Sequence, residues 1–151
     1  MARAMVLAVI GAGDAAEEIC AIAREVGREI ASRGAVLING GRGGVMRAAA
    51  EGARGAGGHT IGILPSYDRA SANEFIEFVI ATGMGEARNA IIVASSDAVI
   101  ALAGEGAPAE IGFAKKLRRP IVALQSWPEI AGLERANIPS EAVDLALKLC
   151  R

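Results

Sequence analysis

Three glycine-bearing stretches in this 151-residue chain could bring backbone N–H groups close to an anion. They are Gly11-Ala12-Gly13, the run Gly40-Gly41-Arg42-Gly43-Gly44, and Ala103-Gly104-Glu105-Gly106. Glycine lets the backbone approach a phosphate without a Cβ in the way, and a helix that starts after such a loop adds free N–H groups and roughly half a positive charge. The chemistry indicated first is therefore the binding of a phosphate-bearing ligand.

The run from Gly40 to Gly44 is the most specific of the three, because four glycines in five positions exceed what a turn before a helix needs. Arg42 inside it could reach a phosphate, although a tight β–α turn with a solvated arginine is the alternative. Gly11-Ala12-Gly13 alone is weak evidence, since the dinucleotide fingerprint G-x-G-x-x-G is incomplete and Asn39 replaces the acidic residue that would hold a ribose. The sequence also lacks the Gly-Lys-Ser or Gly-Lys-Thr of a P-loop.

Few other side chains indicate chemistry. Glu110 falls one turn into the helix after the third stretch, where it could face a ligand or be an ordinary first-turn glutamate favoured by the helix dipole. His59 is expected to be structural, because no Ser or Cys nucleophile with acidic support accompanies it. Cys20 and Cys150 lack partners at metal-ligand spacing, so we expect reduced thiols and no metal site.

Short apolar runs alternate with helical patterns along the whole chain. The runs predict strands at 5–10, 35–38, 60–64, 98–102 and 121–124, with a further apolar segment at 75–80. Helices are expected at 15–33, from 45 onward, and at 83–94, 107–117 and 139–149. This alternation predicts a single α/β domain over residues 1–151, a Rossmann-like doubly wound parallel sheet with helices on both faces. Ligands of such sheets bind beyond the carboxyl ends of the strands, where the glycine loops lie.

Composition narrows the possible partners. The chain is 52% hydrophobic but only 3% aromatic, which suits buried parallel strands covered by alanine-rich helices. A net charge of -1 with scattered Lys and Arg argues against a nucleic-acid partner. No stretch approaches the roughly 20 apolar residues of a membrane span, and 5–10 is too short for a signal peptide. A cytoplasmic protein without a membrane partner is expected.

Two segments are expected to act as surface features. The polar stretch 66–74, with Tyr67 and Asp68, is a candidate lid beside the strand that ends at Leu64. The least regular segment is 125–137, which contains Trp127 and could cover a sheet edge or form a contact surface.

Several stretches, taken in order, resemble the LOG-like Rossmann superfamily. They are Gly40 to Met46, Gly57 to Pro65, Gly85-Glu86-Ala87-Arg88-Asn89, and Gly104-Glu105-Gly106 through Glu110. The superfamily includes the Lonely Guy cytokinin-activating phosphoribohydrolases, long mislabelled lysine decarboxylases, and a branch similar to the molybdenum cofactor carrier proteins. The segment from Gly85 to Asn89 is more similar to the carrier branch.

The resemblance implies a catalytic pair in the hydrolases, an arginine and the last glutamate of the motif P-G-G-x-G-T-x-x-E. Arg88 and Glu110 occupy those positions. The rest of the motif is eroded: Leu102, Ala103 and Ala107 replace its proline, first glycine and threonine, and Asn89 stands where the hydrolases usually carry lysine. Loss of the threonine hydroxyl removes an expected phosphate donor.

Three functions from different classes follow. The leading hypothesis is a binding or carrier protein for a phosphorylated nucleotide or pterin-type ligand, with no required cofactor but a nucleotide or molybdenum cofactor as the possible bound molecule. The runner-up is a nucleoside 5′-monophosphate phosphoribohydrolase, and the third is an interaction module that binds no small molecule. The expected ligand contacts are Gly11, Gly13, Gly40, Gly41, Arg42, Gly43, Gly44, Met84, Gly104, Glu105, Gly106 and Ala107.

A homo-oligomer, dimer or tetramer, is expected from two helices with more apolar positions than one core-facing stripe requires. One helix carries Ala87, Ala90, Ile91 and Ala94, and the other carries Ile111, Phe113, Ala114 and Leu117. Relatives in the LOG-like superfamily associate through helices of this region. The alternative is that the sheet and the segment 125–137 bury both helices within one chain.

Overall fold

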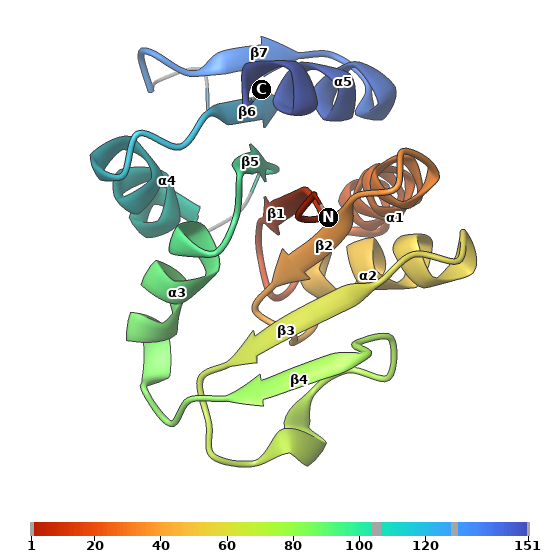
Figure 1. Ribbon diagram of the computed structural model, residues 1–151, viewed down its shortest axis with the longest axis vertical. Coiled ribbons are helices and arrows are strands. Elements are labelled where there is room, and N and C mark those ends of the chain that lie inside the picture. Colours follow the sequence, from red (N-terminus) through yellow and green to blue (C-terminus); the bar gives the residue numbers. More distant parts are fainter. Residues whose placement is uncertain (1, 104–106, 128–129, 151) are drawn as a thin grey trace.

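A computed structural model describes residues 2–103, 107–127 and 130–150 of the chain. In these residues one parallel sheet has the strand order β4-β3-β2-β1-β5-β6-β7, as Figure 1 shows. The strands are β1 (Val6–Ile10), β2 (Val36–Asn39), β3 (Thr60–Leu64), β4 (Phe78–Ala81), β5 (Ala98–Ala101), β6 (Ile121–Leu124) and β7 (Glu134–Ala136).

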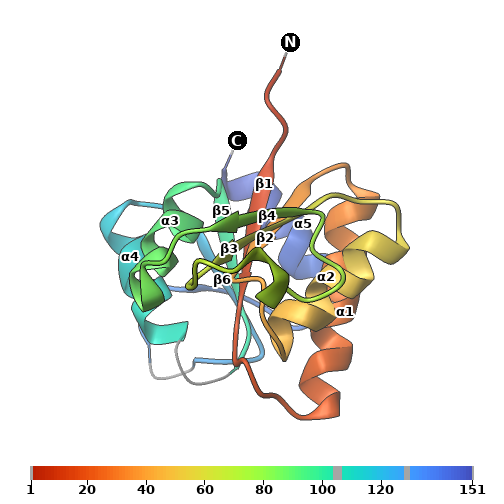
Figure 2. The same cartoon turned by 90° about the horizontal axis from the view of Figure 1, so that it is seen from below.

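Helices cover both faces of the sheet (Figures 1 and 2), so the predicted doubly wound architecture is confirmed. On one face lie α1 (Glu17–Ser32), α2 (Val45–Gly55) and α5 (Pro139–Leu149), and on the other lie α3 (Asn89–Ala94) and α4 (Ala107–Lys116). Strand β1 is continuously apolar because both of its faces are buried. Leu7 and Val9 pack on the α1 side, while Ala8 and Ile10 pack on the α3 side.

The winding of the chain reverses at β1. The strand pairs with β2 on one side and with β5 on the other, because the chain first runs outward to β4 and then returns across β1. The carboxyl ends of β1 and β5 therefore flank a topological switch point, which is the place where open parallel sheets bind ligands.

Three elements have the predicted bounds, namely β3, β6 and α5. The continuous helix expected over 83–94 is wrong. Gly83 and Gly85 have φ angles of 65° and 59°, so the chain makes a short 3₁₀ turn, η2 (Gly85–Arg88), before α3 starts at Asn89. The irregular segment 125–137 contains the edge strand β7, whose only buried side chain is Ala136 and which therefore carries no apolar pattern.

The stretch 66–74 is fastened to its surroundings. It contains the 3₁₀ turn η1 (Arg69–Ser71), and the backbone N–H of Asn73 donates to the Gly41 carbonyl at 2.9 Å. The Asn73 side-chain amide donates to the Arg42 carbonyl at 2.8 Å. These bonds tie the candidate lid to the second glycine loop. Within the described ranges, no helix is long and apolar enough to cross a membrane.

Candidate functional site

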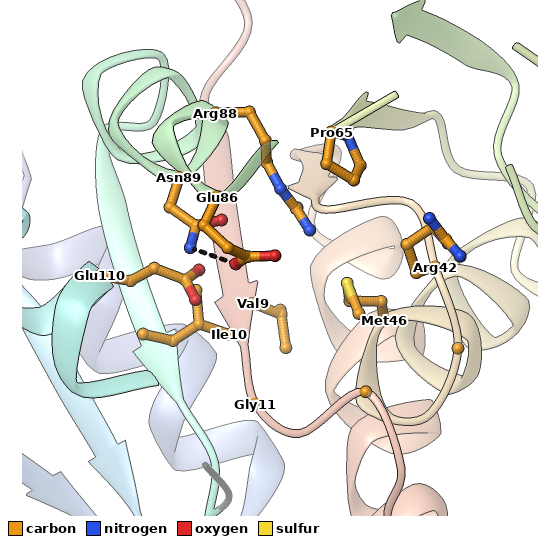
Figure 3. A pocket seen from close by; sticks show the side chains of 12 residues that line it. Val9, Ile10, Gly11, Arg42, Met46, Pro65, Glu86, Arg88, Asn89 and Glu110 are labelled. Atoms are coloured by element: carbon orange, nitrogen blue, oxygen red, sulfur yellow. Dashed lines mark hydrogen bonds between the residues drawn. The ribbon is translucent and has the colours of Figure 1, made fainter. Parts of the chain in front are cut away.

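A cavity of about 430 Å³ opens at the switch point, between the ends of the central strands and the loops that follow them (Figure 3). Both glycine loops that the structure describes contribute to its wall, as do η2 and the first turn of α4. Its lining residues are Val9, Ile10, Gly11, Gly13, Arg42, Gly43, Met46, Pro65, Glu86, Arg88, Asn89 and Glu110.

The first two glycine loops are locked to each other. The N–H of Val45, the first residue of α2, donates to the Ala12 carbonyl at 3.0 Å. A Cβ on Gly44, whose φ is +60°, would collide with that carbonyl, and a Cβ on Gly11 would lie 2.8 Å from the Val45 side chain. Gly11 and Gly44 are thus required by the packing of loop against loop.

Gly40 and Gly41 also have packing reasons. A Cβ on Gly40 would collide with the Arg88 guanidinium, and Gly41 combines a φ of +75° with an approach of 2.9 Å to Leu64. Gly13 differs, because a Cβ there would meet its nearest atom, Cε of Met46, at an ordinary contact distance of 3.6 Å. A Cβ on Gly43 would lie 3.2 Å from the Gly13 carbonyl oxygen, which is a tight contact. Of the described glycines predicted to contact a ligand, Gly13 therefore combines a place in the cavity wall with the most open backbone.

Asn39 shapes the second loop. It is fully buried at the end of β2, where its side-chain oxygen Oδ1 accepts a 2.9 Å hydrogen bond from the Gly41 N–H. Its amide nitrogen donates to the Met46 carbonyl at 3.0 Å, within the first turn of α2. In the sequence, Asn39 stands out only because it replaces the acidic residue that would hold a ribose. In the structure its side chain holds the second glycine loop in shape.

Arg88 is the most unusual side chain of the cavity wall. It is only 6% exposed, and its Nη1 donates to the Ile63 carbonyl at 3.3 Å. Its Nε is buried without a hydrogen-bond partner, and no carboxylate of the described residues forms an ion pair with it. Burial lowers the pKa of the guanidinium, against the opposing fields of Glu86 and Glu110, yet an arginine stays charged in proteins. Because an unpaired buried charge costs free energy, a cation in this position favours the binding of an anion in the cavity.

Two carboxylates line the opposite side of the cavity. Burial is the main cause that raises the pKa of Glu110 to about 7. The nearby charge of Arg88 lowers this pKa, and that of Glu86 raises it. The Asn89 side-chain amide donates to Glu86 at 3.2 Å, as the dashed line in Figure 3 shows. Near neutral pH, Glu110 can therefore hold or release a proton in the cavity wall.

The structure brings together only part of the predicted ligand contacts. The predicted residues that line the cavity are Gly11, Gly13, Arg42, Gly43, Arg88 and Glu110. The other glycines of the second loop, Gly40, Gly41 and Gly44, do not line it and are required by close packing. Met84 lies outside the cavity wall and is 50% exposed. Ala107 begins α4, and Gly104, Glu105 and Gly106 lie outside the described residues.

Sequence reasoning missed Glu86, Asn89, Met46 and Pro65 as cavity residues. Glu86 and Asn89 flank Arg88 in the segment that carried the family resemblance, so their closeness in sequence to Arg88 was the available signal. No group of three or more metal-binding side chains (His, Cys, Asp or Glu) gathers among the residues that the structure describes.

The parallel sheet and the cavity at its switch point place the chain among the Rossmann-like α/β proteins. A model of the SLOG cluster4 family matches residues 4–146, and the chain belongs to that family. The predicted LOG-like membership is thereby confirmed.

Relatives and solved structures agree with this assignment. A protein from Archaeoglobus fulgidus is 44% identical over 146 residues, covering 96% of each chain. The cytokinin riboside 5′-monophosphate phosphoribohydrolase of Mycobacterium tuberculosis is 34% identical over 77% of this chain and 67% of its own.

The molybdenum cofactor binding protein of Rippkaea orientalis has a TM-score of 0.93 at 35% identity, covering 99% of both chains. The molybdenum cofactor carrier protein of Chlamydomonas reinhardtii has a TM-score of 0.89 at 35% identity, covering 97% of this chain and 98% of its own. The predicted similarity to the carrier branch is therefore confirmed at the level of structure.

Proposed function

We propose that this protein binds a phosphorylated nucleotide or pterin-type ligand in the cavity at the switch point and carries it without cleaving it. The observation that supports this most strongly is the buried Arg88 guanidinium, whose Nε lacks a partner in the described part of the chain. The open backbone at Gly13 leaves room for an anion in the same cavity wall. The similarity to molybdenum cofactor binding and carrier proteins favours the same function.

Native mass spectrometry of freshly purified protein tests the proposal directly, because a co-purified small molecule would reveal the ligand's mass. Calorimetry with AMP, GMP and ribose 5-phosphate then measures binding, and Gly43→Val should abolish it by placing a side chain in the cavity wall. Gly55→Val is the matched control, since a Cβ at this exposed position meets nothing within 4 Å. Equal affinities for Gly43→Val and the wild type would remove the proposed site.

A second function is favoured by one observation: Arg88 and Glu110, the positions of the hydrolase pair, line the same cavity. Cleavage of an N-glycosidic bond builds positive charge on the ribose, which an ionised Glu110 would stabilise while it orients water. Arg88 would anchor the phosphate, and the departing base would take its proton from water. Release of adenine and ribose 5-phosphate from AMP, lost in Glu110→Gln, would establish this activity and overturn the carrier proposal.

A further inference from the structure

The cavity has two chemically different walls. Figure 3 shows Arg42 and Met46 on the side of the second glycine loop, and Glu86, Asn89 and Glu110 together on the opposite side. Arg88 comes from the same η2–α3 segment as Glu86, but its guanidinium extends toward Pro65 and the glycine loop. A ligand that spans the cavity would therefore meet cations at one end and carboxylates at the other.

The carboxylate wall is built to accept hydrogen bonds. Asn89 is 5% exposed, and its amide donates to Oε2 of Glu86, which orients that carboxylate. In the described part of the chain neither Glu86 nor Glu110 forms an ion pair with a lysine or arginine. Oxygens of Glu86, and of Glu110 once it is ionised, thus remain available as acceptors toward the cavity.

This inference rests on the proposed function. We propose that Glu86 and Glu110 bind a hydrogen-bond donor edge of the ligand's ring while Arg88 binds its phosphate. The matching ligands are phosphate esters of a 2-amino-4-oxopyrimidine ring, the unit shared by guanine and pterins. Such a ring presents a ring N–H beside an amino group, a donor pair that fits the two oxygens of a carboxylate as an arginine fork does. Adenine presents a ring-nitrogen acceptor next to its amino group, which an ionised carboxylate repels.

Binding of GMP, IMP, AMP and ribose 5-phosphate, compared by calorimetry at pH 8, tests the inference. GMP should bind about tenfold or more tightly than AMP, with IMP between them because it keeps the ring N–H but lacks the amino group. Glu86→Gln should bring GMP close to AMP while leaving ribose 5-phosphate unchanged. Glu18→Gln, at an exposed position of α1, is the matched control.

Other outcomes separate this inference from the proposed function. Equal affinities for GMP and AMP in the wild type, with both ligands failing to bind Arg88→Met, would overturn the donor-edge inference but support the phosphate site. A fall in ribose 5-phosphate binding in Glu86→Gln would show that the carboxylates bind sugar hydroxyls instead. Failure of all four compounds to bind would contradict the proposed function itself. The comparison of GMP with AMP uses the wild-type protein and does not depend on the folding of a variant.

Discussion

Arg88 places a positive charge in the interior of the protein, beside a cavity, and no carboxylate of the described residues is paired with it. A buried charge without a paired counter-charge costs stability, and replacing it with an apolar side chain of similar size is often neutral or favourable. We therefore propose that Arg88 serves ligand binding rather than folding.

We predict that Arg88→Met keeps or raises the free energy of unfolding, by up to about 2 kcal/mol, while it weakens anion binding by about 1.5 to 3 kcal/mol. Urea unfolding and calorimetry measure the two effects. Arg69→Met, at an exposed position of η1, should change neither. A loss of stability without a loss of affinity would show that Arg88 serves the fold.

Glu110 predicts how stability depends on pH. Its pKa is raised from 4.5 to about 7 by burial, so the folded protein keeps this proton to higher pH than the unfolded chain. The free energy of unfolding should therefore fall as pH rises from about 5 to 8, by as much as about 3 kcal/mol from this residue.

Glu110→Gln should remove that part of the pH dependence, because a glutamine has no proton to release. Urea unfolding of both proteins at pH 5 and pH 8 gives the difference, in which the other titrating groups cancel. Parallel pH profiles would show that Glu110 is solvated and titrates near its ordinary value.

At the scale of the element, the loop between β2 and α2 depends on an internal brace. Asn39 satisfies the buried N–H of Gly41 and the carbonyl of Met46 at once. The loop then presents Arg42 and Gly43 to the cavity.

Asn39→Ala should cost about 1 to 3 kcal/mol of stability, because it leaves the buried N–H of Gly41 without its partner, whereas the Met46 carbonyl keeps its helical hydrogen bond within α2. It should also lower ligand affinity, although the side chain does not line the cavity. Asn137→Ala, at an exposed position, should stay within about 0.5 kcal/mol of the wild type by urea unfolding. Unchanged stability of Asn39→Ala would mean that water or a shifted loop replaces the brace.

At the scale of the whole molecule, the apolar positions of η2, α3, α4 and the residue after α4 divide into two sets. Ile111 and Ala114 are buried against the sheet, and the partly buried Trp127, Ile130 and Leu133 pack against the same core. Other apolar positions stay exposed, among them Ala87, Ala94, Phe113 (36% exposed) and Leu117 (39% exposed). The described residues of the segment 125–137 thus cover this face only in part, and the remainder is available to a second copy.

We therefore predict a homo-oligomer in solution that Leu117→Glu disrupts, because the substitution places a charge in the apolar contact. Light scattering at micromolar concentration should give at least twice the mass of one chain for the wild type and a lower mass for the variant. Ile138→Glu, at the exposed apolar residue that precedes α5, is the control. The mass of a single chain, unchanged on concentration, would show that the prediction is wrong.

The sequence by itself determined the architecture and indicated the region of the candidate site. Short apolar runs located β3 and β6 to the residue, and Pro139 at the first position of a helix located the start of α5, because local patterns specify such elements. Strand–helix alternation fixed parallel pairing, and parallel strands bring the loops after β1 and β2 to one edge of the sheet. The motifs around Arg88 and Glu110 identified the two residues that now face the same cavity.

Only the tertiary structure decided which glycines face the cavity and which serve packing. Gly40 makes room for Arg88, which lies 48 positions later in the sequence, and Gly44 makes room for the loop after β1. Glu86 of η2 and Asn89 of α3 line the cavity on the same side as Glu110 of α4. These contacts join segments far apart in the chain, so no local periodicity records them, and only the packed structure reveals them.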